Sequence, residues 1–249
     1  MFGLWLCARQ SALLYDITFK RFLIKDHIHD LRHPASLTKE MTLYLLFQAL
    51  KERRITLKTK FKVSYKASRQ APSKIHLKPG ERISVEKLIH SMVVKSANDS
   101  AVCVAENLCS CEKAFVHEMN KMAKKLGMRK TYFANPSGLP DERNISTAYD
   151  LLKLSHALYR DFPQYFHFFK MKKFQHKSKT FYTRYRLLHK PGIYGIKTGY
   201  IHMSGYNVAT SAIRFDRKKR PHFLIAIVLG QDSAAQRDQK VLNMLNQFF

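Results

Sequence analysis

Three pairs of serine and lysine in this chain are spaced as covalent catalysis could use them. In each pair the lysine follows the serine by three residues, and the serines are Ser36, Ser84 and Ser110. A serine hydroxyl needs a base within hydrogen-bond reach, and residues three apart on a helix share a face. Lysine can be that base when burial or neighbouring cations lower its pKa. Each pair is therefore either a nucleophile with its base or the polar start of a helix.

Two later motifs distinguish Ser36 and Lys39 from the other pairs. Ser96-Ala97-Asn98 follows them in the chain, and Lys197-Thr198-Gly199 follows that. Ser-x-x-Lys, Ser-x-Asn and Lys-Thr-Gly, in this order, form the motif set of the serine enzymes that react with penicillin. Each motif alone is weak, but the ordered triple is specific. We therefore interpret Ser36 as the nucleophile.

The other two serines have a structural interpretation. Ser84 precedes an apolar helical pattern and is predicted to be its N-cap. Ser110 lies at a junction between two predicted helices and is also interpreted as a cap. Neither serine can head the ordered triple with the same spacing, so we assign no chemistry to them.

The apolar pattern predicts the elements that must position these motifs. Two short apolar runs within residues 11–26 indicate strands, and apolar residues at helical spacing after Pro34 indicate a mostly buried helix. Two helices joined around residues 96–98 follow, with further helices over 112–126 and 147–162. Three β-rich runs and a last helix complete the chain, over 192–201, 204–215, 221–230 and 234–248. The prediction is an α+β fold with one antiparallel sheet of about five strands, flanked by helices, and a mostly helical middle region.

The charge of the chain indicates an environment rather than an activity. There are 44 Lys and Arg residues against 18 Asp and Glu, a formal net charge of +26. Such a chain is drawn to polyanions such as nucleic acid, anionic lipid or an acidic cell wall. Because no zinc-finger, phosphate-loop or RNA-binding signature accompanies the charge, we expect no nucleic-acid partner. The densest cluster, Arg217 to Arg220, is predicted to be a solvated turn between two strands.

We expect neither a metal nor an organic cofactor. Asp26 to Asp30 (DHIHD) could suggest metal ligands, but loop-exposed side chains explain it better. Cys109-Ser110-Cys111 has no second Cys or His pair at ligand spacing. Cys103 lies in an apolar run and is predicted to be a buried thiol.

The sequence predicts a single domain over residues 1–249, with residues 1–10 as a short N-terminal extension. The sequence contains no run of about 18 apolar residues, so no segment is predicted to span a membrane. The apolar patch at the N-terminus is too short for the core of a signal peptide, so no signal peptide is visible and an exported protein would need a leader that this sequence lacks.

The motifs and their surroundings resemble the D-alanyl-D-alanine carboxypeptidases, the low-molecular-mass penicillin-binding proteins. The resemblance runs from about Ser11 to the C-terminus, through PASLTKEMT, KSANDSAV, LGMRKTYFANPSGL, STAYDLLKLS, GIKTGY, SGYNVA and IAIVLGQDSAAQR. It implies a β-lactamase/transpeptidase-like fold and a location in the periplasm or cell envelope of a bacterium. It also implies a chain that stops after the catalytic domain, without the β-rich second domain and amphipathic C-terminal anchor of many relatives.

The resemblance implies a role for each catalytic residue. Ser36 would attack the carbonyl between the last two D-alanines of a peptidoglycan stem peptide, and Lys39 would take its proton. Ser96 would relay a proton to the leaving D-alanine, and Asn98 would position Lys39 and the substrate amide. The backbone N–H groups of Ser36 and Tyr200 would form the oxyanion hole.

The resemblance also implies how the substrate is held. Lys197 and Thr198 would bind its terminal carboxylate and line the cleft with Gly199. Arg237 would bind the same carboxylate. The implied partners are peptidoglycan stem peptides, β-lactam antibiotics as acylating inhibitors, and an anionic envelope surface as a peripheral contact.

The sequence departs from the family pattern in its substrate contacts. The first hairpin, DITFKRF, lacks the usual glycine, and Ile201 stands where threonine is common. Thr183 and Tyr185 replace asparagines on either side of Arg184. The glutamate-and-asparagine motif of class A β-lactamases is not apparent.

Two alternatives to a carboxypeptidase remain at the level of sequence. One is a D,D-endopeptidase or β-lactam hydrolase on the same scaffold. The other is a catalytically silent wall-binding protein, against which the three intact motifs argue.

Overall fold

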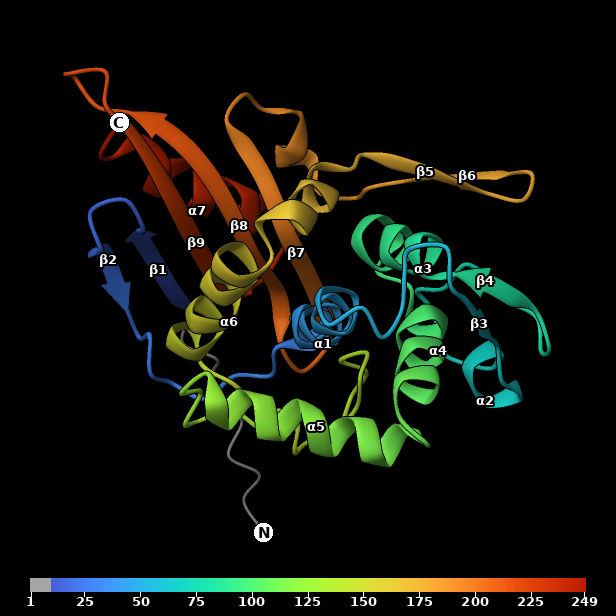
Figure 1. Cartoon of the computed structure of the whole chain (residues 1–249). Coiled ribbons are helices and arrows are strands. Elements are labelled where there is room, and N and C mark those ends of the chain that lie inside the picture. The colour runs from blue at the N-terminus through green and yellow to red at the C-terminus, as the bar shows by residue number, and fades with distance from the viewer. Residues whose placement is uncertain (1–9) are drawn as a thin grey trace, which may run out of the picture.

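A five-stranded antiparallel sheet organises the computed structural model, which describes residues 10–249 (Figure 1). Its order is β2-β1-β9-β8-β7, with bounds β1 (Ser11–Asp16), β2 (Arg21–Asp26), β7 (Ile193–Ile201), β8 (Gly205–Phe215) and β9 (Pro221–Gln231). Strand β1 pairs with both β2 and β9, so the first and last strands of the chain are neighbours. The predicted α+β class and the number of strands are confirmed.

Alternation along the strands gives the sheet two apolar faces. On β9, Ile225, Ile227 and Leu229 belong to the larger core, whereas Leu224 and Val228 belong to a second core on the other face. The last helix, α7 (Ala234–Asn246), covers the second core, and α1 (Lys39–Lys51) and α6 (Ala148–Asp161) cover the larger one (Figure 1). Both faces are therefore closed by helices, as the sequence predicts.

Helix α1 lies at the centre of the larger core. All but two of its residues are buried, and it packs against α4 (Asn98–Leu108), α5 (Glu112–Lys125), α6 and the edge strand β7. A helix that is apolar on every side is stable only inside a core. This burial places the polar residues at the start of α1 in a medium of low polarity.

Several short elements were not predicted. They are α2 (Tyr65–Ser68), the hairpins β3 (Lys60–Lys62) with β4 (Arg82–Ser84) and β5 (Lys173–His176) with β6 (Lys179–Tyr182), and the 3-10 helices η1 (Ala35–Thr38), η3 (Pro163–Lys170) and η4 (Arg186–His189). The first of the two helices predicted to meet around residues 96–98 is observed as α3 (Val85–His90), which a π-helical turn η2 (Ser91–Lys95) continues. The long β5–β6 hairpin extends alongside α3 (Figure 1), and Lys177 in its turn pairs with Glu81 at 2.8 Å. Strands of three or four residues carry too little alternation to be recognised in a sequence.

The two predicted caps have different outcomes. Ser84 is the N-cap of α3, because its Oγ accepts the N–H of Lys87 at 3.3 Å. The prediction for Ser110 is wrong, since the N-cap of α5 is Cys111, whose Sγ accepts the N–H of Ala114 at 3.5 Å. The thiol of Cys111, a residue with extended backbone, therefore caps α5 where the sequence suggested a serine hydroxyl.

Other predicted local features are observed. Arg217 to Arg220 form a turn between β8 and β9, which the Asp216 carboxylate holds by accepting backbone N–H groups. The Cys103 thiol is buried, and burial raises its pKa to about 12. Lys20 takes a left-handed conformation (φ 51°) in the first hairpin, where the family glycine is missing. The predicted extension over residues 1–10 lies almost wholly outside the described residues, and no helix within 10–249 has the length and apolarity to cross a membrane.

Candidate active site

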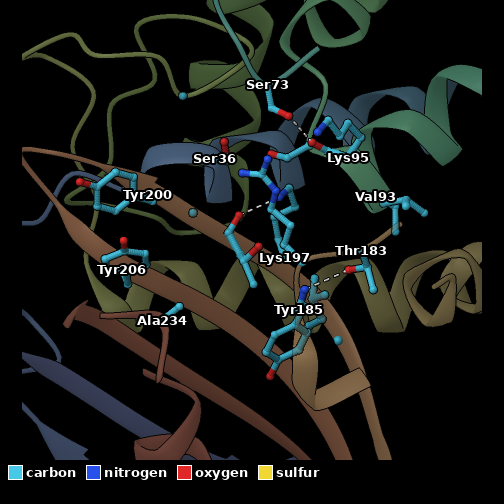
Figure 2. Close-up of a pocket in the computed structure, with 18 of the residues that line it drawn as sticks. Ser36, Ser73, Val93, Lys95, Thr183, Tyr185, Lys197, Tyr200, Tyr206 and Ala234 are labelled. Atoms are coloured by element: carbon cyan, nitrogen blue, oxygen red, sulfur yellow. Dashed lines mark hydrogen bonds between the residues drawn. The ribbon is translucent and has the colours of Figure 1, made fainter. Parts of the chain in front are cut away.

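A cleft of about 550 Å³ lies between strand β7 and the helical region. Eight of the nine predicted site residues line it, namely Ser36, Ser96, Asn98, Lys197, Thr198, Gly199, Tyr200 and Arg237. Figure 2 shows Ser36, Lys197 and Tyr200 around this space. The ninth, Lys39, is fully buried next to it. The fold thus brings together three motifs that are far apart in the sequence.

Ser36 and Lys39 are in contact at the start of α1. Ser36 lies in the 3-10 helix η1, Lys39 is the first residue of α1, and its Nζ is 3.1 Å from Ser36 Oγ. Lys39 Nζ also lies 2.7 Å from Asn98 Oδ1 and 2.5 Å from the carbonyl oxygen of Ser137. An ammonium donates to all three oxygens, whereas a neutral amine donates to the last two and accepts the Ser36 proton. The same geometry therefore suits Lys39 before and after a proton transfer from Ser36.

The surroundings of Lys39 favour its neutral form. Its pKa is well below the ordinary lysine value, first because burial removes water and second because the charge of Lys197 is near. Asp99 acts in the opposite direction. Its carboxylate accepts the N–H groups of Ile75, Leu77 and Ser100, which disperse its negative charge. Desolvation therefore dominates, and Lys39 has the electrostatics of a base.

Asn98 is fixed with its carbonyl towards Lys39. Its Nδ2 donates to the Ala71 carbonyl at 3.0 Å, so Oδ1 is the atom left for the lysine. Asn98 is also the first residue of α4, and its backbone N–H donates to the backbone carbonyl of Ser73 at 2.7 Å. The predicted junction of two helices thus places Asn98, at the start of α4, in the site.

Ser96 has an unusual backbone and an unused hydroxyl. It ends the π-helical turn in the left-handed conformation, with φ 59° and ψ 38°, which is uncommon for a residue other than glycine. Its Oγ is buried and has no hydrogen-bond partner within residues 10–249. The hydroxyl is therefore available to a ligand in the cleft.

Strand β7 runs directly beside the Ser36 turn. A Cβ on Gly199 would lie 3.0 Å from Ser36 N, from the Pro34 carbonyl and from Leu37 Cδ1. Glycine at this position therefore permits the strand to approach Ser36. Thr198 is partly buried beside it, and Tyr200 is exposed.

Lys197 is a buried cation on the same strand, with only 4% of its surface exposed. Its Nζ donates to the Thr198 carbonyl at 2.7 Å. Burial lowers its pKa to about 7, and Arg237 acts in the same direction while Glu40 opposes it. This burial excludes a solvent-facing lysine on the strand.

Arg237 is a second buried cation at the cleft. It belongs to the first turn of α7, but it is 4% exposed rather than solvent-facing. Its Nε and Nη2 donate to Asp238 Oδ1 at 2.9 and 2.6 Å, and its guanidinium lies 5.6 Å from the centre of the Tyr185 ring. The carboxylate of Asp238 and the ring of Tyr185 thus hold Arg237 in place.

Three of the residues that depart from the family pattern belong to the same cleft. Thr183, Tyr185 and Ile201 contribute to its lining, as does Arg184, which matches the family, whereas the first hairpin does not. The structure therefore places these substitutions where they can change contacts with a ligand.

Sequence reasoning missed two parts of the site. Ser137 contributes only its backbone carbonyl to Lys39, and any residue type could supply that group. Gly138 follows with φ 78°, and a Cβ on it would lie 1.9 Å from the Ala35 carbonyl oxygen. The segment NPSGL was recognisable as part of the family resemblance, but nothing in it signalled a contact with the Ser36 turn.

Gly138→Ala should unfold the Ser36 turn or displace it. The clash with the Ala35 carbonyl adds to the cost of a left-handed residue with a Cβ, which is about 1–2 kcal/mol. Gly127→Ala is a matched control, because Gly127 also has a positive φ (73°) but has nothing within 4 Å of the added Cβ. Thermal unfolding should show a much larger loss for Gly138→Ala, and equal losses in the two variants would contradict the close approach.

No group of three or more metal-binding side chains occurs within the described part of the chain. The segment Asp26 to Asp30 forms local contacts instead, with His27 Nε2 at 3.7 Å from Asp26 and His27 Nδ1 at 3.5 Å from Asp30.

Known proteins match both the sequence and the fold. Residues 7–233 match the family model described as D-alanyl-D-alanine carboxypeptidase. The D-alanyl-D-alanine carboxypeptidase DacF of Bacillus subtilis is 32% identical over 245 residues, which cover 96% of this chain and 62% of that protein. The solved penicillin binding protein 6B of Escherichia coli is 33% identical with a TM-score of 0.86, covering 95% of this chain and 75% of the other.

A further solved structure was determined with a β-lactam bound. Penicillin-Binding Protein D2 of Listeria monocytogenes, in its ampicillin-bound form, is 27% identical with a TM-score of 0.83, and the match covers 98% of each chain. The present chain spans less than two thirds of the length of the curated relatives that it matches first. The family model nevertheless matches most of the present chain. The chain therefore belongs to the D-alanyl-D-alanine carboxypeptidase family.

Proposed function

We propose that this protein is a serine-type D-Ala-D-Ala carboxypeptidase that removes the terminal D-alanine from peptidoglycan stem peptides. The observation that carries the proposal is the contact of 3.1 Å between Ser36 Oγ and the buried Lys39 Nζ beside the cleft. A hydroxyl paired with a desolvated amine is an activated nucleophile. Family membership makes a D-Ala-D-Ala terminus the natural substrate for it.

The proposed reaction begins with attack of Ser36 Oγ on the carbonyl carbon of the penultimate D-alanine. The Ser36 proton passes to the Lys39 amine, and the carbonyl oxygen becomes an oxyanion. The backbone N–H groups of Ser36 and Tyr200 would bind this oxyanion, which is consistent with the close approach of β7 to the Ser36 turn.

The intermediate then collapses with cleavage of the peptide bond. The nitrogen of the leaving D-alanine takes the proton that Lys39 received from Ser36, for which the unpartnered hydroxyl of Ser96 is the proposed relay, and Lys39 becomes neutral again. This leaves an ester between the shortened peptide and Ser36. Water attacks the ester with Lys39 as the base, which releases the peptide and restores the Ser36 hydroxyl.

The free carboxylate of the substrate has two proposed cationic partners. Lys197 and Arg237 are both buried at the cleft, and Thr198, which follows Lys197 on β7, adds a hydroxyl to the cleft lining. A buried carboxylate is stable only when paired and hydrogen-bonded. The two cations therefore favour a substrate that ends in a carboxylate, which is the mark of a carboxypeptidase rather than an endopeptidase.

The setting of the activity is also part of the proposal. We place the protein in the cell envelope of a bacterium, acting as one domain on peptidoglycan and acylated by β-lactam antibiotics. Its net charge of +26 supports peripheral contact with an anionic envelope surface.

Two measurements test the proposed function together. The purified protein should form a covalent adduct with fluorescent penicillin and should release free D-alanine from a peptide that ends in D-Ala-D-Ala. An adduct with no release of D-alanine would point to a penicillin-binding protein without the peptidase activity. Absence of both would refute the proposal.

Arg237→Ala tests the carboxylate contact. It should lower kcat/KM for a D-Ala-D-Ala peptide by about ten- to a hundredfold, the loss of about 1.5–3 kcal/mol that is typical of a hydrogen bond to a charged group. For a substrate whose terminal carboxylate is amidated, the variant should show little loss of kcat/KM, because that contact is already missing. Equal losses on both substrates would show that Arg237 acts only by holding the structure, through Asp238 and Tyr185.

A further inference from the structure

One side chain organises the turn over residues 135–139. Asn135 Oδ1 accepts the backbone N–H of Ser137 at 3.1 Å, the Ser137 hydroxyl at 3.1 Å and the backbone N–H of Gly138 at 2.7 Å. Asn135 Nδ2 donates to the backbone carbonyl of Leu139 at 3.1 Å. Asparagine commonly shapes turns by such hydrogen bonds to the backbone that follows it. The path of this turn therefore depends on the amide of Asn135.

The same turn is fastened to α1 at two points. The Ser137 carbonyl lies 2.5 Å from Lys39 Nζ, and the Pro136 carbonyl accepts the Thr42 hydroxyl at 2.7 Å. Lys39 and Thr42 are three residues apart on the helix, so they share a face, and both are fully buried. The turn is therefore held from within by Asn135 and from α1 by Thr42.

The carbonyl of this turn helps to decide the direction of the Lys39 lone pair. Nζ contacts three oxygens, namely Ser36 Oγ at 3.1 Å, Asn98 Oδ1 at 2.7 Å and the Ser137 carbonyl at 2.5 Å. A neutral amine has two hydrogens, and the two carbonyl oxygens can only accept them. The lone pair is then left for the Ser36 hydroxyl. If the Ser137 carbonyl moved away, the amine could turn a hydrogen towards Ser36 instead.

We propose that Asn135 is a positioning residue, which sets the Ser137 carbonyl against Lys39 and thereby aims the lone pair of the amine at the Ser36 hydroxyl. Asn135 lies outside the lining of the cleft that residues 10–249 form, so it acts on the reaction through the turn. The proposal rests on the proposed function, because it concerns the base of that same reaction.

The hydrogen bond with the Ser137 carbonyl also favours a proton on Lys39. A carbonyl oxygen that accepts from Nζ stabilises the ammonium more than the amine, so loosening this contact should lower the pKa of Lys39. The charged groups that act on Lys39 are Lys197 from β7 and Asp99 from α4, and the titratable neighbour on α1 is Glu40. Substitutions that loosen the turn leave all three of these groups in place.

Asn135→Ala should lower the rate constant of acylation at saturating penicillin by about ten- to a hundredfold, as a misplaced catalytic group does. The acidic limb of the pH profile, where Lys39 loses its proton, should move to lower pH by about one unit, since the ammonium loses an acceptor. Penicillin binding before acylation should change little, because Asn135 does not line the cleft. Partial unfolding would reduce the amount of active protein but would not move the limb.

Two further variants separate this role from a structural one. Thr42→Val keeps the buried shape but removes the hydroxyl that holds the Pro136 carbonyl. It should move the limb in the same direction, which keeps the test open if Asn135→Ala fails to fold. Asn107→Ala is the matched control, because the Asn107 amide also joins backbone groups, those of Lys62 and Cys103, but away from the cleft. It should change neither the rate constant nor the limb.

NMR of ¹³C-labelled lysine side chains follows the same proton without any acylation. The resonance that disappears in Lys39→Met belongs to Lys39, and its titration should show a lower pKa in Asn135→Ala than in the wild type. An unmoved titration of Lys39, or an acylation rate constant equal to that of Asn107→Ala, would overturn the proposal. A wild-type protein that forms no penicillin adduct would refute the proposed function instead, and the titration of Lys39 would still decide the role of Asn135.

Discussion

Ser36→Ala is expected to abolish the covalent adduct with penicillin and to lower D-alanine release by a factor on the order of 10⁴ or more, the effect of removing a catalytic serine. The reason is geometric, because Ser36 Oγ is the hydroxyl that contacts the buried Lys39 amine at the cleft. Intact-mass spectrometry after incubation with penicillin measures the adduct directly.

The chain contains its own matched controls for this substitution. Ser84 also precedes a lysine by three residues, but it caps α3 through the N–H of Lys87. Ser110 is exposed and lies outside the lining of the cleft. Ser84→Ala and Ser110→Ala should each keep one adduct per chain. An adduct that persists on Ser36→Ala would remove the assignment of the nucleophile.

Lys39→Arg is expected to slow acylation by about 10²–10⁴-fold, the usual contribution of a general base. A guanidinium keeps its positive charge at any accessible pH and cannot accept the Ser36 proton. Lys39→Met should slow acylation to the same extent, because methionine fills the buried space but has no amine. Lys87→Arg, the equivalent change in an exposed Ser-x-x-Lys pair, should have no effect.

The pH dependence of wild-type acylation checks the same role. Burial and the charge of Lys197 lower the pKa of Lys39, so the reactive neutral amine should appear well below the pH at which an exposed lysine loses its proton. Acylation should therefore rise with pH through that lowered pKa. A near-wild-type rate in Lys39→Arg, or a rise that begins only near the ordinary lysine value, would contradict a neutral Lys39 as the base.

The sequence could predict the parts of the site that depend on side-chain identity in short segments. Ser36 and Lys39 are three apart on one helical turn, and Ser96 to Asn98 and Lys197 to Gly199 are contiguous. Long apolar periods likewise predicted the five strands and the major helices, because burial on one face imposes a regular spacing. These features are local, so no knowledge of the tertiary fold was needed to find them.

The rest of the site depends on contacts that a linear pattern does not contain. The Ser137 carbonyl reaches Lys39 from another segment, and Asp238 holds Arg237 inside the fold rather than in solvent. The partnership of Glu40 with Ser155 joins α1 to α6. Such contacts follow from how the elements pack in three dimensions, so the sequence alone gives no sign of them.

The place of β1 in the sheet has a consequence for how the active site is assembled during synthesis. Ser11 lies opposite Leu229, and β1 is flanked by β2 and β9, so the central pairing of the sheet joins the two ends of the described chain. Contacts so distant in sequence form slowly, because the loop between them must be ordered first. As the chain leaves the ribosome, the Ser36 turn is made early but must wait for β7 to supply Lys197, and β1 must wait for β9. Ser36 and Lys197 therefore cannot meet before β7 has been made, and a nascent chain that stalls before β9 has all three motifs but no completed sheet to hold them.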